Sequence, residues 1–196
     1  MPLLLDLLLA CLLLPILLPV ILAVSLVLFL SQGRPIFFHQ NRVGRNFRLF
    51  RIYKFRTMTV RRRSEEGGFD AGSRERITPI GSFLRKTKLD ELPQIYNVLK
   101  GDMSFVGPRP EVKKWVECYR EEWKPVLSIR PGITDPASIE YRDEEKLLAE
   151  QDKPEKYYAE VILPHKLEIY QEYVKNKSIF LDAKVCMKTL KKVFFR

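Results

Sequence analysis

K-L-D-E-L-P-Q-I-Y-N-V-L-K-G-D-M-S-F-V-G-P-R-P, residues 88–110, is the most informative stretch of this 196-residue chain. Two adjacent acids, Asp90 and Glu91, stand directly before an apolar segment, and Arg109 lies between two prolines at the end of the stretch. A carboxylate can act as a nucleophile or as a metal ligand, and it needs a cation nearby when it attacks an anion. The stretch therefore indicates chemistry on an anionic substrate.

Helical spacing of the apolar side chains predicts a helix over residues 92–99. Pro93 falls in its first turn, and Gly101 follows its end as a C′ glycine. Asp90 at the start of this helix has two roles open to it, an N-cap or a chemical role. The helix dipole there predicts a lowered pKa for Asp90. Glu91 would face another direction, because neighbours in a helix do not share a face.

An apolar run covers residues 3–30 and is interrupted by Asp6, Pro15, Pro19 and Ser25. It exceeds the roughly 20 residues that a helix needs to span a bilayer. No basic region precedes it, so a signal peptide is not expected. The two prolines kink a helix, and two topologies are therefore open: a straight spanning helix, or a re-entrant helix with both ends on one face.

The charge pattern indicates on which side of a membrane the rest of the chain lies. The net charge is +10, and the segment 34–63 directly behind the apolar run contains no Asp or Glu. A basic cluster next to a membrane segment is typical of the cytoplasmic side. We therefore expect a membrane segment over residues 1–31 and a cytoplasmic domain over residues 32–196.

Aromatic residues in 35–38, and basic and aromatic residues interleaved over 49–55, predict a β-hairpin of these two segments. A period of two would place Arg51, Lys54 and Arg56 on one face of it. The turn-like sequence N-R-V-G-R-N lies between the two segments. The hairpin would thus present a row of cations.

The remaining segments give weaker signals. Residues 61–76 form a charged, glycine-containing loop, and Thr78–Pro79 predicts the capped start of a helix. Residues 111–123 are rich in Trp and Tyr and amphipathic. The basic amphipathic segment 178–196 either lies on an anionic membrane surface or packs on the domain core.

Cysteine and histidine patterns exclude several kinds of site. Cys11, Cys118 and Cys186 are scattered, as expected for reduced thiols rather than a metal site or a redox pair. His39 and His165 are isolated, so neither a histidine metal site nor a triad is expected. No glycine-rich nucleotide-binding loop is present in the sequence.

Three motifs carry a resemblance to a known family: F-R-I-Y-K-F-R-T-M (50–58), L-D-E-L-P-Q-I-Y-N-V-L-K-G-D-M-S-F-V-G-P-R-P (89–110) and R-P-G-I-T (130–134). With the apolar N-terminus, they resemble the bacterial sugar transferases, specifically the small monotopic phosphoglycosyl transferases. That resemblance covers most of the chain. It implies a mixed α/β, mainly helical fold, with an N-terminal re-entrant membrane helix and a small cytoplasmic catalytic domain. The domain would contain a short β-hairpin and amphipathic membrane-surface helices.

The resemblance also implies a reaction. A sugar 1-phosphate would pass from a UDP-sugar to polyprenol (undecaprenyl) phosphate, with release of UMP, and membrane glycan assembly would begin. Asp90 would form a covalent aspartyl phosphosugar intermediate in a ping-pong mechanism, assisted by Glu91. Mg²⁺ would be the cofactor, with Asp90 as a ligand, and Lys54, Arg109 and Arg130 would bind phosphate or uridine.

The resemblance further implies location and partners. Pro19 occupies the family's helix-break position, but Leu18 replaces the family's serine, and Pro15 would compensate. The protein would lie in the bacterial inner (cytoplasmic) membrane with its catalytic domain facing the cytoplasm. Its partners would be the UDP-sugar, polyprenol phosphate and the membrane, without nucleic acid, and a homodimer is left open. Residues 135–145 either set the sugar preference or form a solvated charged loop.

Two other functions fit parts of the sequence. A membrane-tethered basic module that binds anionic lipid or nucleic acid would explain the charge and the apolar run, but not Asp90 and Glu91. A polyprenyl-diphosphate hydrolase would also need an acid and cations. Release of UMP from UDP-sugars, with and without polyprenol phosphate, separates the three.

Overall fold

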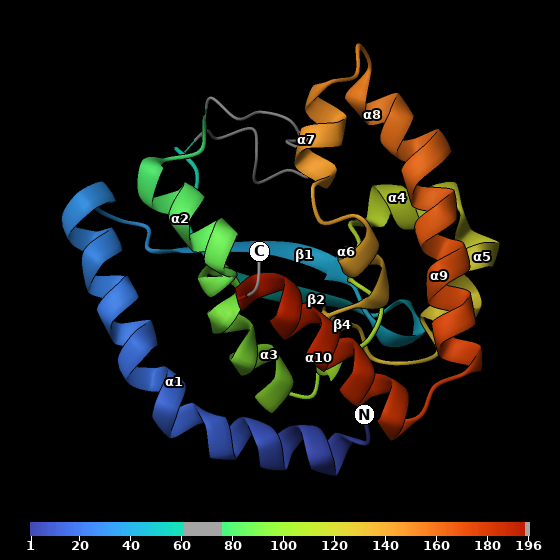
Figure 1. Ribbon diagram of the computed structural model, residues 1–196, viewed down its shortest axis with the longest axis horizontal. Coiled ribbons are helices and arrows are strands. Elements are labelled where there is room, and N and C mark those ends of the chain that lie inside the picture. Colours follow the sequence, from blue (N-terminus) through green and yellow to red (C-terminus); the bar gives the residue numbers. More distant parts are fainter. Residues whose placement is uncertain (61–75, 195–196) are drawn as a thin grey trace.

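The computed structural model describes residues 1–60 and 76–194. It is mainly helical with two small two-stranded sheets, as the resemblance implies (Figure 1). The α-helices are α1 (Leu3–Gln32), α2 (Pro79–Thr87), α3 (Ile95–Leu99), α4 (Lys113–Cys118), α5 (Arg120–Val126), α6 (Pro136–Glu140), α7 (Glu144–Ala149), α8 (Pro154–Tyr157), α9 (Leu163–Lys175) and α10 (Ile179–Phe194). The strands are β1 (Phe37–Val43), β2 (Leu49–Phe55), β3 (Ser104–Val106) and β4 (Gly132–Thr134). Short 3₁₀-helices η1 (Arg45–Phe47) and η4 (Leu89–Gln94) and a π-helix η5 (Tyr158–Ile162) complete the elements.

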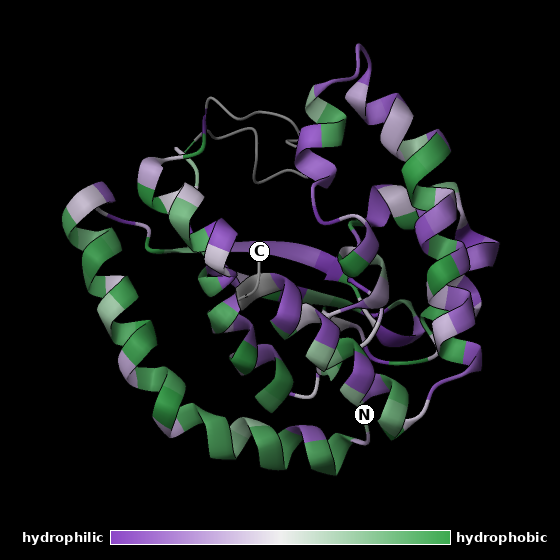
Figure 2. Cartoon of the chain, viewed as in Figure 1, coloured by the Kyte–Doolittle hydropathy of each residue, from purple (hydrophilic) through white to green (hydrophobic). Residues whose placement is uncertain are grey.

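Helix α1 confirms the expectation of a helix long and apolar enough to cross a membrane. It contains Pro15 and Pro19 and follows a curved path around one side of the domain (Figure 1). Figure 2 shows it as almost uniformly hydrophobic. Its inner face packs on the domain at both ends, through Ala10 in one buried cluster and Leu28 in another. The outer face exposes a row of Leu, Ile, Val and Phe side chains.

The predicted hairpin is confirmed, with a first strand that is longer than expected. Strands β1 and β2 are antiparallel, with Phe38 opposite Lys54. The prediction that Arg51 shares a face of the hairpin with Lys54 is wrong. Side chains alternate between the two faces of a strand, and Arg51 lies three residues from Lys54, so it is on the opposite face, where it is exposed. Arg56 is buried and donates to the carbonyl oxygen of Gln32 at the end of α1 (2.6 Å).

The segment that contains the acids forms two short pieces rather than one helix. The 3₁₀-helix η4 comes first, and α3 then covers only Ile95–Leu99. Asp90 is therefore inside η4 and is not an N-cap, which corrects one of its two expected roles; Lys88 holds the cap position, without a side-chain cap. Gly101 has a positive φ of 77°, as its predicted place after the helix requires. The side chain of Asn97 accepts from and donates to backbone groups of β2, which fixes α3 against the hairpin.

Helix α2 begins as predicted, because the Thr78 hydroxyl accepts from Gly81 N (3.0 Å). The predicted loop 61–76 lies outside the described residues, except for Arg76. All three cysteines are free thiols, as expected.

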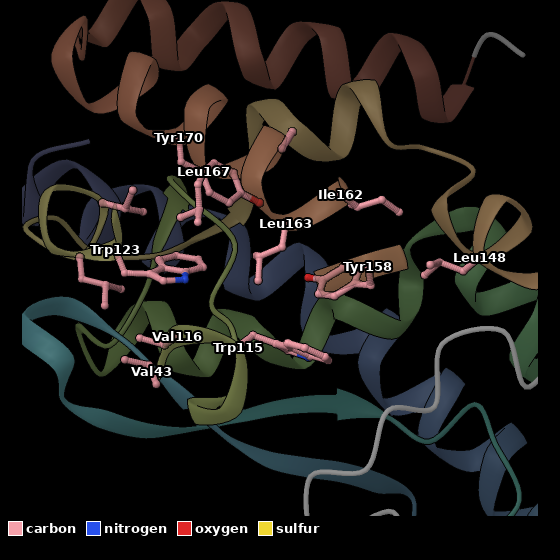
Figure 3. Close-up of a cluster of buried hydrophobic side chains, with 13 residues drawn as sticks. Val43, Trp115, Val116, Trp123, Leu148, Tyr158, Ile162, Leu163, Leu167 and Tyr170 are labelled. Carbon is pink, nitrogen blue, oxygen red and sulfur yellow. The ribbon is translucent and has the colours of Figure 1, made fainter. Parts of the chain in front are cut away.

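The aromatic segment after Pro110 forms α4 and α5, which meet at Tyr119. Both tryptophans are buried and pack with η5 and α9 in the largest apolar cluster (Figure 3). Its fully or nearly fully buried members include Trp115, Trp123, Tyr158, Leu163 and Tyr170. This cluster supports one wall of the cavity described below.

Helix α10 has two different faces. Val185 and Asp182 are buried against the domain, whereas Phe180 is 89% exposed and Met187 and Leu190 are also exposed. One face therefore packs on the core, and contact of the other with a membrane surface stays a prediction.

Candidate active site

The two acids lie on the wall of one large open cavity of about 1100 Å³. Its lining comes from the hairpin, α2, η4, the segment after β3, and the elements α6, α7 and α9. Of the predicted site residues, Lys54, Asp90, Glu91 and Arg109 line it together. These four residues come from three separate segments of the chain and meet at a single place.

Glu91 holds two cations. Lys54 Nζ and Arg109 Nη2 both donate to Glu91 Oε1, each at 2.7 Å. Burial opposes ionisation of Glu91, but Arg109 and Lys54 outweigh it and hold the pKa of this carboxyl well below its ordinary value. Glu91 in turn raises the pKa of Arg109 well above its ordinary value. The ionised form of Glu91 is thus favoured, and it positions two cations.

Asp90 is in the opposite situation. It is 7% exposed, and its buried Oδ1 finds no hydrogen-bond partner among the described residues. Burial raises the pKa of Asp90, with Lys54 acting against the shift and Glu91 adding to it. The lowered pKa expected from the helix dipole is therefore wrong, because desolvation dominates in this short 3₁₀ turn. Asp90 lines the cavity, and a carboxylate with one oxygen left without a hydrogen bond has the chemistry to bond to an electrophile or a metal ion.

The strand pair β3–β4 positions Arg109. These strands are parallel, with Ser104 opposite Gly132, and Gly132 N also donates to Pro108 O (2.9 Å). A Cβ on Gly107 would lie 2.6 Å from the backbone oxygen of Arg130, so only glycine allows this close approach. The segment that precedes Arg109 is thereby fixed on both sides.

Arg130 is the predicted site residue that the structure does not bring to the others. It is absent from the cavity lining as far as the structure describes it, and its guanidinium pairs with Asp6 of α1 (Nη2 to Oδ2, 2.8 Å). Both Arg109 and Arg130 stand next to a proline in their motifs, and both were expected to bind phosphate or uridine. The two side chains point to different partners.

A second charged cluster lines the same cavity and was missed in the sequence. Glu111 accepts from Tyr158 Oη (2.5 Å) and from Arg42 Nη1 (3.1 Å). Lys166 is 5% exposed, pairs with Glu144 and lies 5.2 Å from the ring centre of Tyr158. Glu111 directly follows the G-P-R-P motif, which was a usable signal. The sequence around Tyr158 and Lys166 gave no such signal, because both residues occupy ordinary positions of an amphipathic helix.

Arg85, also missed, joins two walls of the cavity. Its Nε donates to Thr57 Oγ1 (3.0 Å) at the end of the hairpin, and its Nη1 pairs with Glu145 of α7. The Glu145 side chain is 53% exposed, so this ion pair is partly open to solvent. Arg85 therefore adds a cation from α2 to the cavity wall, next to the end of the hairpin.

The residues present fit a magnesium ion at Asp90. Among the described residues no three His, Cys, Asp or Glu side chains form a metal-ligand group. Mg²⁺ commonly takes one or two protein carboxylates and completes its shell with water and substrate phosphates. The unpaired Oδ1 of Asp90 is a suitable single ligand of this kind.

This geometry defines a class: a membrane-associated protein with a buried acidic pair and fixed cations suited to a phosphorylated substrate. The chain belongs to the bacterial sugar transferase family, whose model matches residues 1–196, and the predicted family is thereby confirmed.

Three relatives are informative. The galactosyl transferase CpsE of Streptococcus agalactiae is 41% identical over 83% of this chain and 35% of its own length. The UDP-glucose:undecaprenyl-phosphate glucose-1-phosphate transferase of Escherichia coli is 34% identical over 87% of this chain and 35% of its own. The sugar transferase EpsL of Bacillus subtilis is 38% identical, over 85% of this chain and 74% of its own. The chain thus spans about a third of the first two relatives and most of the third.

Proposed function

We propose that this protein transfers a sugar 1-phosphate from a UDP-sugar to undecaprenyl phosphate and releases UMP. The observation that carries the proposal is the unpaired, buried Oδ1 of Asp90 beside a carboxylate that holds Lys54 and Arg109. The substrates named for the relative from Escherichia coli support the choice of donor class and acceptor. Lipid binding alone would not need a buried acid pair.

The first half-reaction uses Asp90 as the nucleophile. An Asp90 oxygen bonds to the β-phosphorus of the UDP-sugar as the bond from this phosphorus to the UMP oxygen breaks, and UMP leaves with that electron pair. In the second, an oxygen of undecaprenyl phosphate attacks the same phosphorus and Asp90 departs as a carboxylate. Two simpler transfers replace one between two bulky anions.

The cations supply most of the catalysis, because phosphoryl transfer depends mainly on positioning and on charge neutralisation. Lys54 and Arg109 are fixed by Glu91, so they need no rearrangement when charge develops on the phosphoryl oxygens. Bound Mg²⁺ would supply further screening of the diphosphate charge. The raised pKa of Asp90 reflects incomplete stabilisation of its charge, which leaves the ionised carboxylate reactive.

The test is a UMP-release assay with and without undecaprenyl phosphate. The correct UDP-sugar alone should give at most one UMP per protein and one sugar-phosphate added to Asp90, and added lipid should remove the adduct and start turnover. A hydrolase would instead act on the polyprenyl diphosphate, and a binding module would release no UMP. An adduct mapped to another residue would end this mechanism.

We also propose that α1 is re-entrant, with both ends on the cytoplasmic face of the inner membrane. Contacts of both ends with the same domain support this: Gln32 Nε2 donates to Thr78 Oγ1 (3.1 Å), and Asp6 pairs with Arg130. Replacement of Pro15 and Pro19 by Ala should favour a straight spanning helix, because the proline defects permit the bend. A cysteine placed near residue 2 should then be labelled more strongly from outside intact cells. External labelling of the protein that keeps both prolines would contradict the re-entrant topology.

Residues 135–145 provide the third proposal, a preference for particular sugars. Two of the acids there already hold cations, Glu144 on Lys166 and Glu145 on Arg85. Asp143 lines the cavity with an exposed side chain, and it is the acid best suited to accept from a sugar hydroxyl. Asp143→Asn should change the ratio of kcat/KM among a panel of UDP-sugars, since hydrogen bonds to a hydroxyl discriminate between substrates. An equal effect on every UDP-sugar would assign 135–145 to the scaffold.

A further inference from the structure

Asp6 is an unexpected residue in an apolar run. It is the single charged side chain in residues 3–30, and it is 0% exposed. A buried carboxylate in a membrane segment is costly unless it is paired, so its partner is informative. The mechanism proposed above does not use it.

The Asp6 carboxylate accepts three hydrogen bonds from the domain. Oδ2 accepts from Arg130 Nη2 (2.8 Å), and Oδ1 accepts from Ser104 Oγ (3.0 Å) and Phe105 N (3.1 Å). Arg130 is only 13% exposed in its side chain and also donates to the carbonyl oxygen of Met1 (3.1 Å), just before α1 begins. Both charges are thus removed from water and compensated by each other.

These contacts reach both strands of the small parallel sheet. Ser104 and Phe105 belong to β3, and Arg130 lies two residues before β4. The part of α1 before its first proline, residues 3–14, is called the first arm here. Asp6 therefore attaches the first arm to the β3–β4 strand pair, of which β3 precedes Arg109 in the chain and β4 follows it.

We infer that Asp6 and Arg130 form a buried joint that holds the first arm on the domain's side of the membrane. Prolines allow α1 to bend, but a bend alone does not select a direction for the arm. An ion pair with the domain selects it, because the arm can reach Arg130 only from the face where the domain lies. Arg130 is then a positioning residue, and this inference rests on the proposed re-entrant topology rather than on the proposed reaction.

The test measures the side of the membrane on which the first arm ends. Pro2→Cys is introduced in a chain whose Cys11, Cys118 and Cys186 are replaced by serine, and protoplasts are labelled with a membrane-impermeant maleimide before and after permeabilisation. In the parent chain, with Asp6 and Arg130 intact, the cysteine at position 2 should be labelled only after permeabilisation. Asp6→Asn and Arg130→Gln should each raise external labelling by about tenfold or more, because each leaves a buried charge unpaired. Arg130→Lys keeps the charge and should label as the parent does.

Asp102→Asn is the matched control: it makes the same change in an ion pair with Lys100 that is partly exposed (3.3 Å), and it should not alter labelling. If the single variants do not accumulate, Asp6→Asn with Arg130→Gln leaves no unpaired charge and should accumulate while still labelling from outside. Parental labelling in that double variant would overturn the joint. External labelling of the parent would instead overturn the re-entrant topology, and neither result depends on UMP release.

Discussion

Two regions of this molecule each contain a buried aspartate near an arginine, and they differ in how the carboxylate is satisfied. At the joint, Asp6 accepts three hydrogen bonds and is fully buried. In the cavity, Asp90 keeps an oxygen without a hydrogen-bond partner among the described residues, and Arg109 is bound to Glu91 instead.

This difference matches the roles proposed for the two acids, structural for Asp6 and reactive for Asp90. A buried polar atom left unpaired costs about 1–3 kcal/mol, and folded proteins tolerate such costs mainly where function requires them. Burial raises the pKa of Asp90, in keeping with a charge that its surroundings do not fully stabilise. The same substitution at the two positions should therefore have opposite consequences.

Asp90→Asn should produce the largest effect on turnover. The amide keeps the shape of the side chain but cannot attack phosphorus, so UMP release should fall by about 10⁴-fold or more, as for loss of an enzymatic nucleophile. The thermal midpoint should be unchanged or higher, since a poorly stabilised buried charge is removed. Turnover close to that of the parent would show that Asp90 is not the nucleophile.

Asp6→Asn should act on stability instead. It leaves Arg130 buried without its counter-charge, which should cost about 3 kcal/mol and lower the thermal midpoint by roughly 6–12 °C. Thermal unfolding of the purified protein in detergent measures this. A midpoint within a degree of the parent would mean that Asp6 is not a structural acid, and the contrast with Asp90 would fail.

Local signals in the sequence were sufficient for much of the site. Thr78 before Pro79 predicted the start of α2, and alternation predicted the hairpin that carries Lys54. The motif that contains Asp90 and Arg109 predicted residues that line one cavity. Each of these signals depends on neighbours within a few residues.

Long-range contacts could not be predicted in this way. Arg130 finds its partner 124 residues away, and Lys166 meets Glu144 only because α7 and α9 fold together. Asp90 was assigned a lowered pKa because a regular helix was expected, whereas a 3₁₀ turn and burial decide it. Sequence signals identified the residues that line the cavity better than the distant pairs that hold the architecture.

Arg109→Lys should reduce kcat by about 10²-fold, because a lysine cannot both bind Glu91 and present a planar guanidinium to phosphate. Steady-state UMP release with the preferred UDP-sugar measures this. If activity remains within a few-fold of the parent, Arg109 would be structural, like Arg130.

The pH dependence of adduct formation should distinguish the charges around Asp90. Attack requires the ionised carboxylate, so the rate should fall as pH drops, with a midpoint above the ordinary Asp pKa because burial raises the pKa of Asp90. Glu91 adds to that shift and Lys54 opposes it. Glu91→Gln should therefore move the midpoint to lower pH, and Lys54→Gln should move it to higher pH. Single-turnover adduct formation across pH measures both, and shifts of the same sign would contradict this assignment.

Arg130→Lys should have the smallest effect of the series, and it completes the comparison with Arg109→Lys. Both arginines are next to proline, but only Arg109 lines the cavity among the described residues. A lysine at position 130 can still pair with Asp6 while losing a bond to a backbone carbonyl, so stability should fall by about 1 kcal/mol. Because the Arg130 side chain is not part of the cavity lining among the described residues, kcat/KM should stay within a few-fold of the parent. UMP-release assays of the two lysine variants in parallel give the ratio of their kcat/KM values. If both variants lose about 10²-fold in kcat/KM, Arg130 acts on the substrate and the two regions are not separate.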